Sequence, residues 1–340
     1  MRVWRGAIAG FGQVAVHGHL PAWQRQHDFE LVAVCDADPA RRALAAKLLP
    51  AARVYPSFEE LLGHEHIDFV DIATPPATHA AHVEAAARHG VHVLCEKPLT
   101  TSLAEFHWMA RCARAAGVIL HTVHNWRFSE AYQALQAAMR RERLGPIHHV
   151  EWRTVRQGCA PGAGGLWRLD PALAGGGILV DHGWHAFYLL ADLIGELPEE
   201  VSAAMSQERY RDTPVEDTAT CRVSFPSSTA EIHLTWAGNT RETCWRIVAR
   251  DGEVRLANTR LHVCGQTGER EFELPSPAAG SHHPEWFDGV IAEFRAALAR
   301  PAERRDNLAE AALCVALLHD AYRSAKAAGR PFKVAIPNLR

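Results

Sequence analysis

Several features that would narrow the function of this 340-residue chain are absent from its sequence. No apolar run approaches the roughly 20 residues that a membrane-spanning helix needs. The N-terminus leads directly into a strand pattern, without the charged, apolar and cleavage regions of a signal peptide. A formal net charge of −3, with no basic cluster, argues against a nucleic-acid partner. The eight cysteines include no CxxC pair, so we expect reduced thiols in a cytoplasmic protein without a membrane partner.

The chain is long enough for two domains of ordinary size, and we place their boundary after residue 124. In residues 1–124, strand patterns alternate with helix patterns, which predicts an N-terminal Rossmann domain, an α/β fold with a doubly wound parallel sheet. Residues 125–340 predict an α+β domain with a large, mostly antiparallel open sheet. The later strand patterns are Val201–Gln207, Asp217–Phe225, Ala230–Trp236, Cys244–Ala249, Glu253–Ala257 and Leu261–Cys264, and helix patterns follow at Glu285–Leu298 and Asn307–Ala328.

A glycine motif, Gly10–Ala15 (GFGQVA), follows the first strand and opens a helix. Gly10 permits a tight turn, Gly12 lets a pyrophosphate approach the backbone, and the helix N-terminus offers unpaired N–H groups to phosphates. Such a motif can also be a simple glycine-rich turn. Here an acid, Asp36, ends the second strand 21 residues beyond Ala15, near the spacing at which a carboxylate binds the adenosine ribose. The combination predicts dinucleotide binding.

The choice of dinucleotide depends on Asp36. Its carboxylate accepts hydrogen bonds from a free 2′-hydroxyl and repels a 2′-phosphate, which favours NAD over NADP. Arg41 and Arg42 lie close in sequence, and an arginine there can accommodate the phosphate. Both arginines also fit the first turns of an exposed helix, so NADP remains the less favoured alternative.

Two further segments follow strands of the predicted parallel sheet, at the edge where ligands bind. Ala73, Thr74 and Pro75 end the fourth strand, with His79 near the next helix start. Glu96-Lys97-Pro98 ends the fifth strand, so that Lys97 is fixed at the mouth of the sheet. An isolated lysine would be interpreted as a solvated surface residue, but this position favours a functional one. The predicted cofactor-binding residues are Gly10, Phe11, Gly12, Gln13, Val14, Asp36, Ala73, Thr74, Pro75, His79, Glu96 and Lys97.

These segments resemble the Gfo/Idh/MocA family, named for glucose–fructose oxidoreductase and inositol dehydrogenase. The resemblance implies that Lys97, in the Glu96-Lys97-Pro98 motif, is the shared catalytic-site residue near the nicotinamide and the reacting substrate carbon. The segment Trp167–Leu190 supports the resemblance, because it resembles the family's glycine run followed by D-x-G-x-H, with Asp181 and His185 as the acid and the histidine.

The resemblance also implies substrate contacts in the second half of the chain. Family members use the positions of Asp181 and His185 to bind substrate hydroxyls and to transfer a proton. The two residues are four apart, so they share one face of a helix. The segment Asn125–Phe128 resembles a family segment that often touches substrate. The predicted substrate-binding residues are Lys97, Asn125, Arg127, Trp167, Asp181, His182 and His185, and the predicted catalytic residues are Lys97, Asp181 and His185.

Two features leave alternatives open. Asp181, His182, His185, His282 and His283 could be interpreted as metal ligands, although their spacing does not define a coordination shell and hydride transfer needs no metal, so we predict none. The indole rings of Trp126, Trp167 and Trp184 lie near motif residues in sequence. Each could carry a sugar ring on its face or simply fill a core.

The sequence thus predicts an NAD-dependent oxidoreductase acting on a secondary hydroxyl or ketone of a sugar, polyol or sugar derivative. In this hypothesis Lys97 and His185 handle the proton and polarise the oxygen, while Asp181 holds a hydroxyl or orients His185. One alternative is an enzyme that retains NAD and oxidises a sugar transiently for elimination, hydrolysis or epimerisation. Another is a non-catalytic dinucleotide-sensing protein. We also expect a homodimer or homotetramer formed through the C-terminal sheet, on the apolar content of Ala230–Trp236 and Cys244–Ala249.

Overall fold

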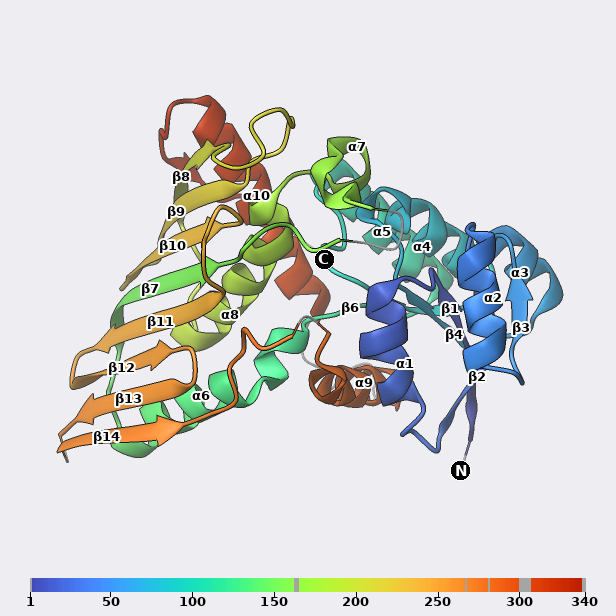
Figure 1. Ribbon diagram of the computed structural model, residues 1–340, viewed down its shortest axis with the longest axis horizontal. Coiled ribbons are helices and arrows are strands. Elements are labelled where there is room, and N and C mark those ends of the chain that lie inside the picture. Colours follow the sequence, from blue (N-terminus) through green and yellow to red (C-terminus); the bar gives the residue numbers. More distant parts are fainter. Residues whose placement is uncertain (1, 162–164, 267, 281, 300–306, 338–340) are drawn as a thin grey trace.

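The computed structural model describes residues 2–161, 165–266, 268–280, 282–299 and 307–337. Within them the strands form two sheets, which lie on opposite sides of the molecule with helices between them (Figure 1). None of the helices in these ranges is both long enough and apolar enough to cross a membrane.

The first sheet has six parallel strands among the described residues, in the order β3-β2-β1-β4-β5-β6. This order reverses direction next to β1, as in doubly wound dinucleotide-binding folds. Successive residues of β1 point to opposite faces, and Ala7 and Ile8 are both fully buried in different core clusters, so both faces are covered. The strands are β1 Trp4–Ala9, β2 Phe29–Cys35, β3 Arg53–Tyr55, β4 Phe69–Ile72, β5 His92–Cys95 and β6 Leu120–Thr122.

The helices of this part begin and end at the residues expected to stop them. Ser102 accepts a hydrogen bond from the Glu105 N–H at the start of α5, and Gly117 ends that helix as a C-cap with φ 67°. Asp38 caps α2 and Ser57 caps α3 in the same way. The elements are the π-helical turn η1 Ala15–His19, α1 Leu20–Trp23, α2 Pro39–Leu48, α3 Phe58–His64, the 3₁₀ turn η2 Pro76–Thr78, α4 His79–Arg88 and α5 Leu103–Ala116.

One helix from the second half of the chain covers the first sheet. Helix α9, Pro284–Ala299, lies against α1 (Figure 1). Its residues Phe287 and Phe294 are buried in the same cluster as Ile8 and Phe69. The sequence pattern predicted the helix but assigned it to the second domain. The division after residue 124 remains our proposal, with α9 reaching across it.

The second sheet has nine strands among the described residues, in the order β14-β13-β12-β11-β7-β10-β9-β8-β15. Among the described strands of this sheet, only β7 and β10 pair in parallel, so the predicted mostly antiparallel sheet is confirmed. The sequence analysis missed both edge strands, because β14 is polar and β15 is very short. The strands are β7 Ile147–Val155, β8 Glu200–Ser206, β9 Thr218–Ser224, β10 Thr229–Thr235, β11 Glu242–Ala249, β12 Gly252–Ala257, β13 Arg260–Gly265, β14 Gly268–Glu273 and β15 Phe332–Lys333.

Three helices cover one face of this sheet: α6 Glu130–Glu142, α8 Trp184–Ile194 and α10 Asn307–Lys326 (Figure 1). The core beneath them is aromatic, and Trp152 of β7 stacks on Trp245 of β11 with ring centroids 4.3 Å apart. The shorter turns on this side carry the signature segment. They are η3 Asn125–Phe128, η4 Trp167–Leu169, α7 Pro171–Ala174 and η5 Leu179–Gly183.

The opposite face of the second sheet is polar, which corrects one part of the oligomer argument. The apolar residues of β10 and β11, including Ile232, Trp245 and Ile247, are buried beneath the helices. Arg222 with Glu231, and Arg246 with Glu151, form ion pairs among their more exposed neighbours. The buried apolar residues of Ala230–Trp236 and Cys244–Ala249 therefore build the core and are not available to a partner.

Candidate active site

A cavity of about 970 Å³ lies where the carboxyl ends of the first sheet's strands meet the second half of the chain. Such sheet edges are the usual ligand sites of doubly wound folds. Fifteen of the residues predicted to contact cofactor or substrate line it: Gly10, Gly12, Gln13, Val14, Asp36, Ala73, Thr74, Pro75, Glu96, Lys97, Asn125, Trp167, Asp181, His182 and His185.

The glycine loop leaves open backbone at one end of the cavity. Gly10 has φ 89°, and a Cβ placed there would lie 2.9 Å from the main-chain oxygen of Ala73, so only glycine fits. A Cβ on Gly12 would meet nothing within 4 Å. Asp36 closes the loop from the next strand, with Oδ2 accepting the Phe11 N–H at 2.7 Å. An open glycine backbone beside a carboxylate fits the pyrophosphate and ribose of a dinucleotide.

The two arginines after Asp36 are used differently. Arg42 donates from Nη1 to the main-chain oxygens of Asp36 and Ala37, both at 2.9 Å. It thus stabilises the turn and does not line the cavity, whereas Arg41 does. Any accommodation of a 2′-phosphate would therefore fall to Arg41.

Lys97 extends from the end of β5 to the second half of the chain. Its Nζ donates to Asp181 Oδ1 at 2.9 Å and to the Asp181 main-chain oxygen at 2.8 Å. Arg168 Nε lies 3.6 Å from the same Oδ1. Burial on its own raises the pKa of Asp181, but the charges of Lys97 and Arg168 hold that pKa well below its usual value. Asp181 is therefore an anion at neutral pH.

Glu96 is held by a buried histidine, which explains the acid in the Glu96-Lys97-Pro98 motif. His19 Nε2 lies 2.9 Å from Glu96 Oε1, and His19 Nδ1 lies 3.0 Å from Asp71 Oδ2. Burial lowers the pKa of His19, but Asp71 and Glu96 together raise it to about 10, so His19 is protonated between two carboxylates. The second Glu96 oxygen accepts the Lys97 N–H at 2.9 Å. The network fixes the backbone from which Lys97 extends.

His185 is held by Tyr188. Its Nδ1 lies 3.2 Å from Tyr188 Oη, which also accepts the Trp126 N–H at 3.0 Å. The imidazole stacks on the Trp126 indole with centroids 5.0 Å apart. The sequence analysis offered Asp181 as the residue that orients His185. The structure shows Asp181 bonded to Lys97 and gives Tyr188 the contact with His185.

The protonation state of His185 follows from its burial. Its side chain is buried, and this burial, with the charge of Lys97, holds its pKa well below 6.5. The imidazole is therefore neutral at pH 7, and it does not titrate near neutrality. A neutral histidine can accept a proton from a substrate, and it can act as an acid only after it has been protonated.

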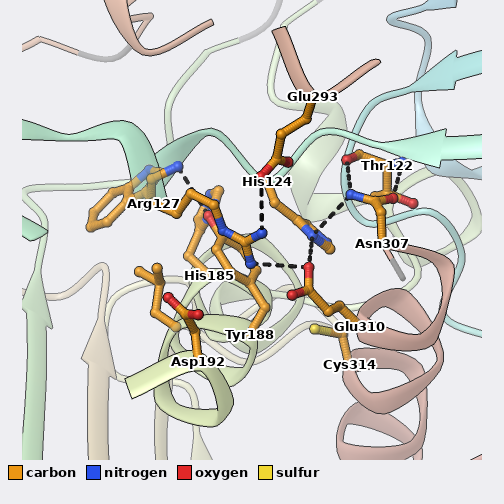
Figure 2. Close-up of polar contacts among 12 residues, drawn as sticks. Thr122, His124, Arg127, His185, Tyr188, Asp192, Glu293, Asn307, Glu310 and Cys314 are labelled. Atoms are coloured by element: carbon orange, nitrogen blue, oxygen red, sulfur yellow. Dashed lines mark hydrogen bonds and ion pairs between the residues drawn. The ribbon is translucent and has the colours of Figure 1, made fainter. Parts of the chain in front are cut away.

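Three predicted contact residues lie behind the cavity wall. Figure 2 shows Arg127 directed toward Glu293 and Glu310, at 3.5 and 3.0 Å. His79 is fully buried, and its Nε2 lies 2.9 Å from the Thr74 main-chain oxygen. The Phe11 side chain is also fully buried in the core. None of the three lines the cavity, so their side chains support its wall.

The three tryptophans near the motif residues lie in different environments. Trp126 and Trp167 line the cavity, whereas Trp184 is fully buried and does not. Arg168 lies over the Trp167 ring, 4.4 Å from its centroid. Two of the three indoles therefore border the cavity, and the Trp184 indole fills the core.

The glycine run before Asp181 packs against an acid that the sequence analysis did not single out. Glu216 accepts hydrogen bonds from the Gly177 N–H at 3.1 Å and the Leu179 N–H at 3.0 Å. A Cβ on Gly177 would lie 1.8 Å from the Glu216 main-chain oxygen. This contact requires glycine and fixes the start of η5, which carries Asp181. No spacing rule links Glu216 to the run.

Within the described ranges, no cluster of three or more His, Cys, Asp or Glu side chains is arranged to hold a metal ion. His182 Nε2 lies 3.8 Å from Asp181 Oδ2, and His283 stacks on Trp286 with centroids 3.6 Å apart. The alternative of a metal site built from these histidines has no geometric support in this part of the chain.

The sheet order and the cavity define a dinucleotide-binding protein, and comparison with known proteins identifies its family. Residues 4–124 match the model of the oxidoreductase family with an NAD-binding Rossmann fold, and residues 132–268 match the GFO/IDH/MocA C-terminal domain. The chain belongs to the Gfo/Idh/MocA family. The protein is an NAD-binding oxidoreductase that acts on CH–OH groups, and the resemblance found in the sequence is confirmed.

Individual relatives extend over most of the chain. D-apiose dehydrogenase of Paraburkholderia graminis is 30% identical over 293 residues, which are 83% of this chain and 75% of the relative. 1,5-Anhydro-D-fructose reductase of Ensifer adhaerens is 29% identical, over 79% of this chain and 80% of the relative. An oxidoreductase from Agrobacterium radiobacter, crystallised with NAD⁺, L-tartaric acid and magnesium, superposes with a TM-score of 0.85. It is 24% identical and matches over 97% of this chain and 98% of its own.

Proposed function

We propose that the protein is an NAD-dependent dehydrogenase or reductase that interconverts a secondary hydroxyl and a ketone on a sugar, polyol or sugar derivative. The observation that carries this proposal is the meeting of Lys97, Asp181 and His185 in the cavity that also contains the glycine loop and Asp36. Relatives named as dehydrogenases or reductases of D-apiose and 1,5-anhydro-D-fructose support a carbohydrate substrate.

The cofactor end of the cavity fits NAD in this proposal. Gly10 and Gly12 offer open backbone to the pyrophosphate, and Asp36 accepts hydrogen bonds from a free ribose 2′-hydroxyl. Bound NAD would supply the acceptor for the hydride, and its reduced form would supply the donor. The carboxylate of Asp36 repels a 2′-phosphate, so NAD is preferred to NADP.

Lys97 acts on the reacting oxygen. Its ammonium carries three donors, and two are directed to Asp181. The remaining donor is free to hydrogen-bond the substrate oxygen and to stabilise the negative charge that develops there. Asp181 holds the ammonium in place and can accept a neighbouring substrate hydroxyl.

His185 transfers the proton. When its Nδ1 carries the ring proton and donates to Tyr188 Oη, the lone pair of Nε2 can accept the proton of the substrate hydroxyl. In the reducing direction the same atom returns it. The low pKa of His185 keeps this lone pair available at neutral pH.

A panel of sugars and polyols with NAD, followed by NADH absorbance, tests the proposal. We expect net NADH formation from at least one member, and its loss in the Lys97→Ala variant. An enzyme that oxidises its substrate only transiently would convert sugar without net NADH. That result would replace the proposal with the retained-cofactor alternative.

A further inference from the structure

The substrate end of the cavity carries more positive than negative charge. Arg156, Arg168 and Arg241 line it together with Lys97. Of the described acids in this part of the lining, Glu96 already faces the protonated His19. Asp181, a described carboxylate in this part of the lining, interacts electrostatically with all four cations. A neutral sugar would leave this imbalance inside the cavity.

Arg156, the first residue after β7, is the most informative of these cations. It is 2% exposed and makes no ion pair with any described carboxylate. Its Nη1 donates to the main-chain oxygens of Val155 and Glu242, and its Nη2 donates to Thr243 Oγ1 at 3.2 Å. Its Nε–H is buried without a partner among the described residues. Three of the five guanidinium donors are thus used, and two remain.

Arg241 donates to the main-chain oxygens of Ala278 and Gly280, and its charge adds to that of Arg156 at this end of the cavity. Burial, and secondarily the charge of Arg241, lower the pKa of Arg156 to about 10. The charges of Arg156, Lys97 and Arg241 all act on His182, whose pKa lies well below its usual value chiefly because it is buried. Arg168 lies near Asp181, which Lys97 already contacts, and it also donates to the Ala160 main-chain oxygen and lies over the Trp167 ring.

A buried guanidinium without a counter-ion is unfavourable, because its lost hydration is not replaced by an opposite charge. Carbonyl oxygens satisfy its donors but do not neutralise its charge. An oxyanion would do both, since a guanidinium donates to two oxygens of a carboxylate or phosphate at once.

We propose that the substrate is an anionic sugar derivative, whose carboxylate or phosphate binds at Arg156 and Arg241 while its reacting carbon lies at Lys97. This inference rests on the proposed function and adds the substrate class. Arg156 and Arg241 are then the residues that select a charged sugar from a neutral one, and Lys97 stays free for the reacting oxygen.

Calorimetric titration of the NAD-saturated protein with three sugars of one carbon skeleton tests the inference. D-Glucuronate carries a carboxylate, D-glucose 6-phosphate carries a phosphate, and D-glucose carries neither. We expect at least one charged sugar to bind about 10-fold or more tightly than glucose, the scale of one hydrogen bond to a charged group. The charged sugar that binds more tightly shows whether the site prefers a carboxylate or a phosphate.

Variants of the residues next to β7 and β11 separate this site from a structural role of the arginines. Arg156→Gln and Arg241→Gln should each abolish most of the preference for the charged sugar while NAD affinity is kept. Arg153→Gln is the matched control, because Arg153 lies on β7 just before Arg156, its side chain is 55% exposed, and it does not line the cavity. Arg241 is exposed, so we expect its variant to fold even if the Arg156 variant does not.

Equal binding of all three sugars, or no binding of either charged sugar, would overturn the inference. The inference would also be overturned if the ratio of charged-sugar affinity to glucose affinity were the same in Arg156→Gln and Arg241→Gln as in Arg153→Gln. The NADH assay with sugars and polyols tests the proposed function independently of these binding measurements. NADH formation without tighter binding of the charged sugars would support the proposed function and reject this substrate class. Tighter binding of a charged sugar without NADH formation would support the substrate class and reject the proposed function.

Discussion

Lys97 and Asp181 are 84 residues apart in the chain, yet the Lys97 ammonium donates to both the carboxylate and the main-chain oxygen of Asp181, at 2.9 and 2.8 Å. The lysine comes from the end of β5 and the acid from η5, so the pair joins the two halves of the chain. The same pair defines the reacting end of the cavity. Its geometry leads to the first prediction.

Lys97→Ala should reduce turnover by about 10²-fold or more, the scale seen when one electrostatic donor to a developing oxyanion is lost. Lys97→Arg should recover little, because a planar guanidinium does not replace a compact ammonium. NAD affinity, measured by titration, should stay close to that of the unaltered protein. The exposed Lys47→Ala serves as the control. Lost NAD affinity with full turnover at saturating NAD would show that Lys97 is instead a cofactor clamp.

His185 should set the acid limb of the pH–rate profile. Its pKa is lowered from 6.5, so the neutral, proton-accepting form persists as the pH falls and is lost only below 6.5. We expect kcat/KM to be flat through neutrality and to decline below that value. His185→Ala should reduce turnover by about 10²–10⁴-fold. An acid limb at or above pH 6.5, or an active His185→Ala beside an inactive His182→Ala, would assign the proton to another group.

Asp36→Ser should weaken the preference for NAD over NADP, because it removes the carboxylate that repels a 2′-phosphate. The affinities of both dinucleotides, measured by titration, give the result. Since Asp36 also accepts the Phe11 N–H, some loss of affinity for both is expected. Arg42→Gln is the control, because Arg42 is bound to backbone oxygens. Tighter binding of NADP than NAD by the unaltered protein would contradict the role given to Asp36.

His19→Gln should destabilise the protein in a pH-dependent manner. The folded-state pKa of His19 is raised to about 10 from 6.5, so its protonation stabilises the fold fully below pH 6.5, and this contribution is lost as the pH rises toward 10. Denaturant unfolding at several pH values should show the largest difference between variant and unaltered protein at the acidic end. The exposed His107→Gln should show none of this dependence. A difference that is constant with pH would indicate that His19 is neutral.

Self-association should be sensitive to salt. We propose a homodimer or homotetramer through the open face of the second sheet, and that face carries ion pairs such as Arg222 with Glu231 and Arg246 with Glu151. Exposed charges are screened by added salt. Light scattering at micromolar concentration should therefore give a multiple of the monomer mass at low salt and a smaller mass at high salt. A monomer mass under both conditions would refute the oligomer.

The sequence was most informative where one pattern has one structural solution. Continuous apolar strands such as Phe29–Cys35 predict burial on both faces, and the carboxyl ends of parallel strands meet at one edge. Gly12, Asp36 and Lys97 were therefore expected together, and all line one cavity. The edge strand Gly268–Glu273 was missed because its exposed, polar residues lack the alternation of a half-buried strand.

Residues that act through distant partners could not be predicted from local pattern. Arg156 has the sequence appearance of an exposed strand residue, and only the fold buries it at the cavity. His19 acquires its role from Asp71 and Glu96, which follow it by 52 and 77 residues. Arg127 was assigned to substrate because Asn125–Phe128 resembles a family segment, and its ion pairs with Glu293 and Glu310 could not be foreseen, since both acids lie far along the chain.

The position of α9 has a consequence for how the protein is made. As the chain leaves the ribosome, all six strands of the first sheet emerge before residues 284–299, which supply Phe287, Ile291 and Phe294 to one of its faces. The nascent sheet therefore exposes Ile8, Phe11 and Phe69 until most of the protein has been translated. Exchanging residues 4–124 for those of a relative would likewise replace only one side of this contact. The nucleotide-binding half is continuous in sequence, but one face of its sheet is covered by a helix from outside that half.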